Sequence, residues 1–283
     1  MFKKIGIIYH PKNKAAHDLA SELEKYLNSQ GIACWVCSAW KSSELEQSIA
    51  GCDLILTTGG DGTILRTAQA VAGSMTPVTG INLGKVGFMT ELNSGEVMDK
   101  LPDLLAGKGW IDERSMLDAD FTPHGSQNKV VHQFTALNDV VLSRGDIVRV
   151  VNIEVSINNE PMTTYKADGV IVATATGSTG YSLAAGGSIL SPEASDLILT
   201  PILPHLNPGY SLVLPPETEI SLRIGTTHHA TLCIDGHINL PLSDSDTIRV
   251  RRSQKKTLFL RIHPKDLYYS RLEQKLKGNN RLV

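Results

Sequence analysis

The sequence lacks any strongly basic region. Its 27 Lys and Arg residues are balanced by 29 Asp and Glu residues, so the formal net charge is −2 and no basic tail or stripe is visible. Nucleic acids and anionic membranes are therefore poor candidates for its partner. The sequence also lacks a run of ~18 apolar residues, the length of a membrane span, and its first apolar run, residues 5–9, is too short for a signal peptide. These absences predict a cytoplasmic protein.

Cysteine is scarce as well, with four residues in 283: Cys34, Cys37, Cys52 and Cys233. The first two form a C-x-x-C pair, but they fall in a predicted strand, where positions three apart face opposite sides. A redox C-x-x-C normally opens a helix, and a zinc site needs a second pair. We therefore expect ordinary reduced cysteines, while a redox role for Cys34 and Cys37 stays open.

The sequence has the composition of a globular protein with a sizeable core, 41% hydrophobic and 20% charged residues. In its first part, short apolar runs alternate with amphipathic segments. We expect strands at about 5–9, 32–36, 53–57 and 77–81, and helices at 14–30, 43–50, 63–72 and, after a cap at Asn93 or Ser94, up to about 106 with a break near Pro102. This alternation predicts a doubly wound parallel sheet, with ligands beyond the carboxyl ends of the strands.

After Trp110 the helical periodicity largely disappears. Short runs bounded by turn residues indicate strands at about 148–157, 162–166, 170–173, 211–214, 219–224 and 230–234. Turns are expected at Asn158–Pro161 and at Asp235–Gly236, because Asn, Asp and Gly accept the backbone angles of tight hairpins. From Pro264 to about Lys277 the pattern is helical again.

This change in the sequence pattern predicts two domains. An α/β domain covers residues 1–114, and the tail 262–283 is expected to pack back on it. A β-rich, β-sandwich-like domain covers residues 115–261. No internal repeat and no low-complexity segment is visible.

One motif lies where the ligand edge of the parallel sheet is expected: Gly59, Gly60, Asp61, Gly62 and Thr63. Glycines let the backbone approach a ligand closely, and unpaired N–H groups at a helix N-terminus bind anions. A carboxylate beside phosphates repels them unless a divalent cation bridges the two or the carboxylate accepts a proton. The alternative is a strand–helix turn in which Asp61 only caps the helix. The loop is neither a Walker loop nor a G-x-G-x-x-G fingerprint.

The second domain carries its own cluster, Asp168–Gly187, in which a buried strand runs into a loop of glycine and small hydroxyl residues, then an aromatic residue and a short helix. Small hydroxyls and exposed amides suit a ribose and the edge of a base, with Tyr181 stacking on the ligand or walling the site. The alternative is a surface turn with Tyr181 in the core. Asn138 and Asp139, adjacent in an apolar strand, need polar partners. They either cap a turn or bind a polar ligand.

Three motifs occur in a fixed order: Gly59-Gly60-Asp61-Gly62-Thr63, Asn138-Asp139, and Asp168-Gly169 followed by Thr176-Gly177-Ser178-Thr179-Gly180-Tyr181-Ser182. Together they resemble the NAD kinase family of the bacterial type, and the resemblance covers nearly the whole chain. Pro201–His205 and Asp235–Gly236 are further landmarks. The first motif alone is shared with lipid kinases of the diacylglycerol and sphingosine type, whereas the third together with the Asn–acid pair is specific.

The resemblance implies a kinase that phosphorylates the 2′-hydroxyl of the adenosine ribose of NAD to give NADP. It implies ATP or polyphosphate as the donor and a divalent cation, most commonly Mg²⁺. Asp61 would be the catalytic carboxylate that accepts the proton of that hydroxyl. The other positions that match nucleotide-binding residues of the family are Gly59, Gly60, Gly62, Thr63, Arg66, Phe88, Asn138, Asp139, Arg149, Lys166, Asp168, Thr176, Thr179, Gly180, Tyr181, Ser182, Leu183, Ala184 and His237.

Within that set the resemblance implies separate roles. Asn138 and Asp139 would hold the adenine and the ribose hydroxyls, and residues 179–184 would line the adenosine pocket. Asp168 would bind the nicotinamide end, with Lys166 close by. The positions expected against or around the bound nucleotide are Gly62, Phe88, Arg66 and Arg149.

Four positions depart from the family's pattern. Ala175 stands where proline is usual, Gly180 where alanine is usual, Asp139 where glutamate is commoner, and His237 where many members carry glutamine. Gly180 loosens the adenosine loop and Asp139 shortens the reach to the ribose, so the preference between NAD and NADH stays open. Two other functions also stay open: a lipid or small-alcohol kinase with the same loop, and a non-catalytic NAD(P) sensor.

Members of this family assemble as homodimers or homotetramers, so the resemblance implies a homo-oligomer. Pro201–His205 would then reach the nucleotide of a neighbouring subunit. The choice between ATP and polyphosphate, the preferred cation and feedback by NADP(H) are not fixed by the sequence.

Overall fold

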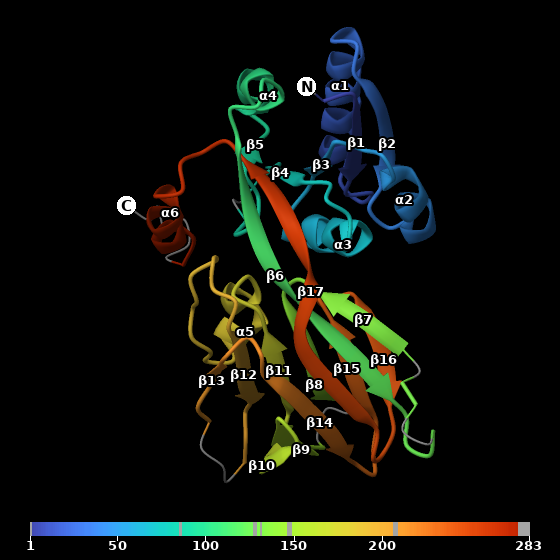
Figure 1. Ribbon diagram of the computed structural model, residues 1–283, viewed down its shortest axis with the longest axis vertical. Helices are drawn as coiled ribbons and strands as arrows, with labels where there is room; N and C mark the ends of the chain where they lie inside the picture. Colours follow the sequence, from blue (N-terminus) through green and yellow to red (C-terminus); the bar gives the residue numbers. More distant parts are fainter. Residues whose placement is uncertain are drawn as a thin grey trace. The chain divides into compact units, whose positions relative to one another are not determined.

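The chain folds into two compact units (Figure 1). The computed structural model describes residues 2–84, 87–126, 129–130, 132–145, 149–205 and 209–276. The first unit is Met1–Glu113 together with Thr257–Val283, and the second is Arg114–Lys256. The long strands β6 (Trp110–Thr122) and β17 (Thr247–Arg261) each continue from one unit into the other. Among the described residues, no helix is long and apolar enough to span a bilayer.

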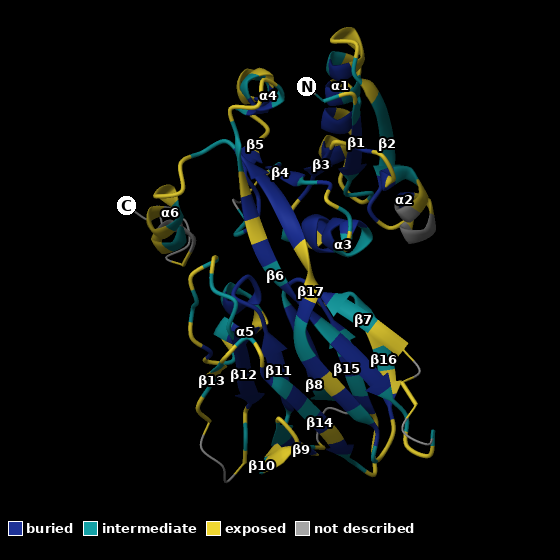
Figure 2. Cartoon of the chain, viewed as in Figure 1, coloured by how far each residue is buried: buried dark blue, intermediate teal, exposed yellow. Residues whose placement is uncertain are grey.

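The first unit is built on a parallel sheet. Its strands, in spatial order, are β5 (Leu92–Asn93), β4 (Val78–Asn82), β3 (Leu54–Thr58), β1 (Lys4–Tyr9) and β2 (Ala33–Ser38). Its helices are α1 (Lys14–Ser29), α2 (Ser42–Ile49), α3 (Asp61–Val71), α4 (Val97–Leu105) and α6 (Leu267–Leu276). Strands β3 and β4 are buried at every residue, as expected for parallel strands covered on both faces (Figure 2). The predicted doubly wound sheet is confirmed.

The helix boundaries follow local chemistry. Asn13 caps α1 by accepting the N–H of Ala16, and Gly31, at a φ of 74°, follows its end as expected. For α4 the predicted break at Pro102 is wrong, because the helix runs through Pro102. The predicted cap is supported at Asn93: its Oδ1 accepts the N–H groups of Gly95 and Glu96, and Glu96 Oε1 accepts the Asn93 N–H, although the helix itself starts only after Glu96. Proline removes one helical hydrogen bond, and burial of the apolar face of α4 compensates for that loss.

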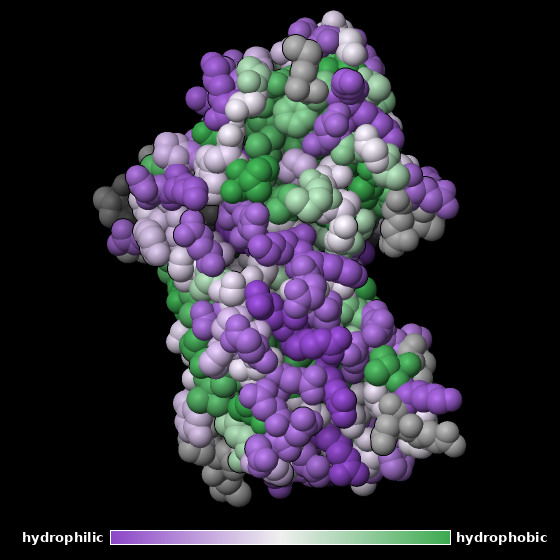
Figure 3. Space-filling view, viewed as in Figure 1, coloured by the Kyte–Doolittle hydropathy of each residue, from purple (hydrophilic) through white to green (hydrophobic). Residues whose placement is uncertain are grey.

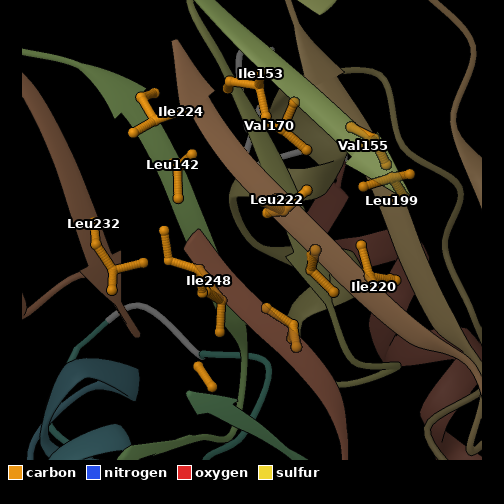
Figure 4. Packing of buried hydrophobic residues seen from close by; sticks show 14 of the residues in the cluster. Leu142, Ile153, Val155, Val170, Leu199, Ile220, Leu222, Ile224, Leu232 and Ile248 are labelled. Carbon is orange, nitrogen blue, oxygen red and sulfur yellow. The ribbon is translucent and has the colours of Figure 1, made fainter. Parts of the chain in front are cut away.

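The second unit is a pair of antiparallel sheets. One has the order β13 (Leu212–Leu214), β12 (Leu197–Ile202), β11 (Gly169–Ala173), β8 (Asp139–Arg144), β15 (Ala230–Ile234) and β16 (Ile238–Leu242). The other contains β10 (Glu160–Ala167), β9 (Val151–Ile157), β14 (Glu219–Gly225), β17 and β6, with β7 (His132–Ala136) paired to β6. Leu142, Val170, Leu199 and Leu232 of the first sheet share one core with Ile153, Val155, Ile220, Leu222, Ile224 and Ile248 of the second (Figure 4). The predicted β-rich fold is confirmed.

The patterns of this unit are those of half-buried antiparallel strands. Buried and exposed residues alternate along β9, and hydrophilic residues gather over β14 and β17 on the face in view (Figure 3). Asn158 and Asn159, with φ of 51° and 67°, form the predicted turn between β9 and β10. Asp235 and Gly236, with φ of 48° and 69°, form the predicted turn between β15 and β16.

All four cysteines are free. Cys34 and Cys37 lie in β2, so the predicted strand is confirmed. Burial raises the pKa of the Cys34 thiol to about 12 and also raises that of Cys37. Because the thiolate is the reactive form, these environments disfavour redox chemistry at the pair.

Candidate active site

The glycine loop joins the buried strand β3 to helix α3. The Gly59 N–H donates to the carbonyl of Ile81 in β4, which fixes the start of the loop. A Cβ on Gly59 would collide with Thr63 Oγ1, whereas a Cβ on Gly60 or Gly62 would meet no atom within 4 Å. Gly60 is the N-cap of α3, and no side chain caps the helix. The loop therefore presents glycine backbone and an uncapped helix N-terminus to open space.

The Asp61 carboxylate is held by the backbone of a second segment. Its Oδ2 accepts the N–H of Phe88 at 2.8 Å and its Oδ1 accepts the N–H of Met89 at 3.1 Å. A Cβ on Gly87 would collide with Asp61 Oδ1, so any larger residue there would have to displace the Asp61 carboxylate. Asp61 thus does not cap α3, which was the alternative interpretation of the sequence. Each oxygen keeps a lone pair beyond the one it uses, so the oriented carboxylate can still accept a proton.

Three hydroxyl groups near this edge have no hydrogen-bond partner among the described residues. Thr57 Oγ1, Thr63 Oγ1 and Thr90 Oγ1 are all buried. Arg66 lies one turn beyond Gly62 on α3, and burial lowers the pKa of its guanidinium. The structure therefore brings Gly59–Thr63, Arg66 and the Phe88 backbone together within the first unit.

A second polar site lies in the β-rich unit, around Asn138 and Asp139. The Asp235 carboxylate accepts the N–H groups of Leu137 at 2.8 Å, of Asn138 at 2.7 Å and of Asp139 at 3.1 Å. These bonds fix the backbone just before β8. The Asn138 Oδ1 atom stays buried and has no hydrogen-bond partner among the described residues. A buried acceptor of this kind is costly unless a ligand supplies a donor.

Asp139 is a buried acid with a perturbed pKa. It is 6% exposed, and burial raises the pKa of its carboxyl to about 7, with a further contribution from the charge of Asp235. Burial also raises the pKa of Asp235, although its three N–H donors oppose that change. Asp139 is therefore near its pKa at neutral pH, and can either donate or accept a hydrogen bond.

The loop 174–184 packs directly against this pair. Thr174 Oγ1 donates to the Leu137 carbonyl at 2.6 Å and accepts the Gly177 N–H at 3.1 Å. A Cβ on Gly177 would collide with the Asn138 carbonyl. A Cβ on Gly180 would lie 3.6 Å from Asn138 Nδ2 and 3.9 Å from Asp139 Oδ2. The loop and the Asn–Asp pair predicted from the sequence therefore meet in one site.

The remaining loop residues divide into exposed and buried groups. Tyr181 is 48% exposed, so the alternative that placed it in the core is wrong. Ala184 is exposed, while Thr179 and Leu183 are half-buried. Ser182 and Thr176 are buried, with Ser182 Oγ 3.3 Å from Thr200 Oγ1 and Thr176 Oγ1 accepting from Arg114 at 3.3 Å. Tyr181 and Ala184 are thus the exposed residues of this loop between positions 176 and 184.

Four further predicted residues belong to other segments of this unit. Asp168 forms an ion pair of 2.9 Å with Arg144 at the opposite end of β8 and β11 from Asp139. At about 3.4 Å per residue, the two sites are roughly 17 Å apart along the strands. Lys166 and Arg149 are exposed. His237 is half-buried, with Nδ1 3.0 Å from the Asp235 carbonyl.

Sequence reasoning missed the roles of three residues. The sequence indicates Asp235 only as a turn residue and a family landmark, because its carboxylate reaches the backbone of residues 137–139 from 96–98 positions away along the chain. Gly87 follows a predicted strand end, but its fit against Asp61 depends on a contact 26 residues away along the chain. The pairing of Arg144 with Asp168 depends on the register of two antiparallel strands. Lys85 and Val86, which precede Gly87, lie outside the described residues.

Comparison with known proteins gives a consistent result. Residues 30–109 match the model of the ATP-NAD kinase N-terminal domain, and residues 137–262 match that of the ATP-NAD kinase C-terminal domain. An NAD kinase of Dehalococcoides mccartyi (strain CBDB1) is 55% identical over 283 residues, which are 100% of this chain and 99% of that protein. An NAD kinase of Chloroflexus aggregans is 39% identical over 277 residues, 98% of this chain and 99% of that protein.

Two solved structures have the same fold. Yeast NADH kinase complexed with NADH superimposes with a TM-score of 0.86 at 26% identity, covering 99% of this chain and 90% of that one. An NAD kinase from Archaeoglobus fulgidus in complex with ATP gives a TM-score of 0.78 at 23% identity, covering 97% of this chain and 98% of that one. At that identity the second similarity shows the fold alone.

Proposed function

Because this chain belongs to the NAD kinase family and phosphorylates NAD to give NADP with ATP as co-substrate, we propose that Asp61 accepts the proton of the ribose 2′-hydroxyl. The observation that carries the proposal is the fixed orientation of the Asp61 carboxylate, bound by the N–H groups of Phe88 and Met89 beside the open Gly60 and Gly62. A general base must be held within hydrogen-bond reach of the proton that it removes.

Phosphoryl transfer requires positioning and neutralisation of charge rather than covalent chemistry by the protein. The loop amides and the uncapped N-terminus of α3 supply partial positive charge for the donor phosphates. In a loose transition state the acceptor hydroxyl loses its proton late, so Asp61 needs the right position more than a raised pKa. We propose the Gly59–Thr63 loop as the site of the transferred phosphoryl group.

A divalent cation, with Mg²⁺ as the first candidate, is part of this proposal. Among the described residues no group of three His, Cys, Asp or Glu side chains could hold a metal ion by itself. Mg²⁺ is commonly bound through one or two carboxylates plus substrate phosphates and waters, and Asp61 fits that pattern as the one carboxylate of the glycine loop. When bound, such a cation neutralises phosphate charge.

For the acceptor, we propose that Asn138, Asp139 and the loop 176–184 hold the adenosine of NAD. The unpartnered Asn138 Oδ1 suits a donor such as an exocyclic amine, and Asp139 suits a ribose hydroxyl. The exposed Tyr181 ring can cover a base. Asp168, Lys166, Arg149 and His237 remain proposed contacts to the rest of the dinucleotide.

We also propose a cytoplasmic homo-oligomer in which Pro201–His205 reaches a neighbouring subunit. Support comes from Leu203, an apolar residue that is 71% exposed with a φ of 44° at the end of β12. Light scattering at working concentration tests this proposal. A monomeric mass would remove it.

The function is tested by a coupled assay for NADP with NAD, Mg²⁺ and either ATP or polyphosphate. We expect NADP with ATP, loss of activity on chelation, and recovery on adding Mg²⁺. The polyphosphate arm decides whether the donor must be a nucleotide. Binding of NAD without NADP from either donor would contradict the proposal and favour the sensor function instead.

A further inference from the structure

A tryptophan with two cations over its ring lies at the carboxyl edge of the parallel sheet. Trp40 is 43% exposed, unusual for so large an apolar side chain. Lys12 Nζ lies 4.8 Å and Arg66 Cζ 5.7 Å from its ring centroid. His10 packs edge-on against the same ring at 5.7 Å. We call these four residues the Trp40 platform.

The topology explains why the platform adjoins the glycine loop. Tyr9 at the end of β1 is paired with Ser38 at the end of β2 and with Thr58 at the end of β3. The segments that follow these three strands therefore leave the sheet at the same edge. The His10 N–H donates to the Thr58 carbonyl at 3.0 Å, and a Cβ on Gly59 would lie 3.2 Å from His10 Cβ.

Within the part of the chain that the structure describes, neither Lys12 nor Arg66 has a carboxylate at ion-pair distance. Burial lowers the pKa of Arg66, as expected for a cation that loses water without gaining a neighbouring negative charge. By contrast, Lys41, the residue after Trp40, is paired with Glu44 at 3.1 Å. His10 Nδ1 is also buried and unpartnered among the described residues.

We propose that the Trp40 platform binds the part of the donor's phosphate chain that is not transferred. This inference rests on the proposed function, since the glycine loop would hold the transferred phosphoryl group. The ligand class is a condensed phosphate, either the triphosphate of a nucleotide or inorganic polyphosphate. Lysine supplies a compact charge and arginine a planar fork that matches phosphate oxygens. The Trp40 ring holds both cations in place.

The first test measures the Michaelis constant for each donor at saturating NAD. In Lys12→Gln we expect the KM for ATP to rise about ten-fold, because a charge-assisted contact to phosphate is lost. The KM for NAD should change less than two-fold. Lys41→Gln is the matched control, since its charge is already paired, and it should leave both constants unchanged. A rise with ATP alone assigns the platform to nucleotides, and a rise with both donors assigns it to condensed phosphate in general.

The second test needs no turnover. Tripolyphosphate, which carries no base, is titrated into the full chain while tryptophan fluorescence is recorded. We expect a saturable change that is absent in Trp40→Phe, where Trp35 and Trp110 still report the background. An unchanged donor KM in Lys12→Gln, or the same fluorescence change in Trp40→Phe, would overturn the inference. Absence of NADP from wild type would contradict the proposed function instead. The tripolyphosphate titration would still test whether the Trp40 platform binds condensed phosphate.

Discussion

Replacing Asp139 with asparagine should make the protein more stable at pH 8 than the wild type. Asp139 is 6% exposed, and burial beside Asp235 raises its pKa from 3.8 to about 7. The folded state therefore holds a proton that the unfolded chain loses above about pH 4. Since each pKa unit is worth about 1.4 kcal/mol, ionising this buried acid costs roughly 4 kcal/mol at pH 8.

The direction follows from proton linkage. A carboxyl whose pKa is raised by folding stabilises the folded state at low pH, and that stability is lost as pH rises from about 4 to about 7. The asparagine side chain in Asp139→Asn keeps the shape of the carboxyl group and has no proton to lose, so the variant avoids this cost. We expect the variant to gain about 2–4 kcal/mol in free energy of unfolding at pH 8 and almost nothing at pH 4.5.

The assay is urea denaturation of both proteins across pH 4.5–8, without ligand. Asp168→Asn is the control, because Asp168 is partly exposed and paired with Arg144, and its replacement should not stabilise at any pH. NAD affinity should fall in Asp139→Asn although the variant stays folded. Equal stabilities of variant and wild type at pH 8, or a difference that persists at pH 4.5, would refute the reasoning.

Three glycine positions and one acid give further predictions. Gly87→Ala should lower kcat more than ten-fold with little change in melting temperature, because a Cβ there displaces the Asp61 carboxylate; unchanged kcat in the coupled assay would count against it. Gly177→Ala should weaken NAD binding measured by calorimetry, since its Cβ meets the Asn138 carbonyl, whereas Gly180→Ala, with contacts of 3.3 Å or more, should be tolerated. Asp235→Ala should cost about 3–5 kcal/mol in urea denaturation, because three N–H groups lose their acceptor; a loss below 1 kcal/mol would be contrary to this.

Local sequence signals predicted most of the helices and strands. Buried apolar runs and Gly31 gave β3, β4 and the end of α1, and Asp235–Gly236 gave the hairpin. These features depend on residues that are close together in the sequence, so the local pattern predicts them. The continuous helix through Pro102 was missed because the packing of α4 outweighs the local cost of proline.

The features that could not be predicted from the sequence depend on contacts between segments that are far apart along the chain. The role of the Asp235 carboxylate requires that β15 pair with β8 in one register. The Trp40 platform requires that β2, β1 and β3 be neighbours, which their order along the chain does not reveal. Asp61 was expected to cap its own helix or act on a substrate, yet its visible partners come from residues 88 and 89.

The measurement that tests the central claim most directly separates turnover from NAD binding in Asp61→Asn. We predict that kcat falls by about 10²–10⁴ while the Kd for NAD, from calorimetry, stays within about three-fold of wild type. Asp53→Asn is the matched control, because Asp53 also accepts two backbone N–H groups, from Lys3 and Lys4, at the other end of β3. A loss of NAD affinity equal to the loss of kcat, or full activity in Asp61→Asn, would contradict the assignment of Asp61 as the proton acceptor.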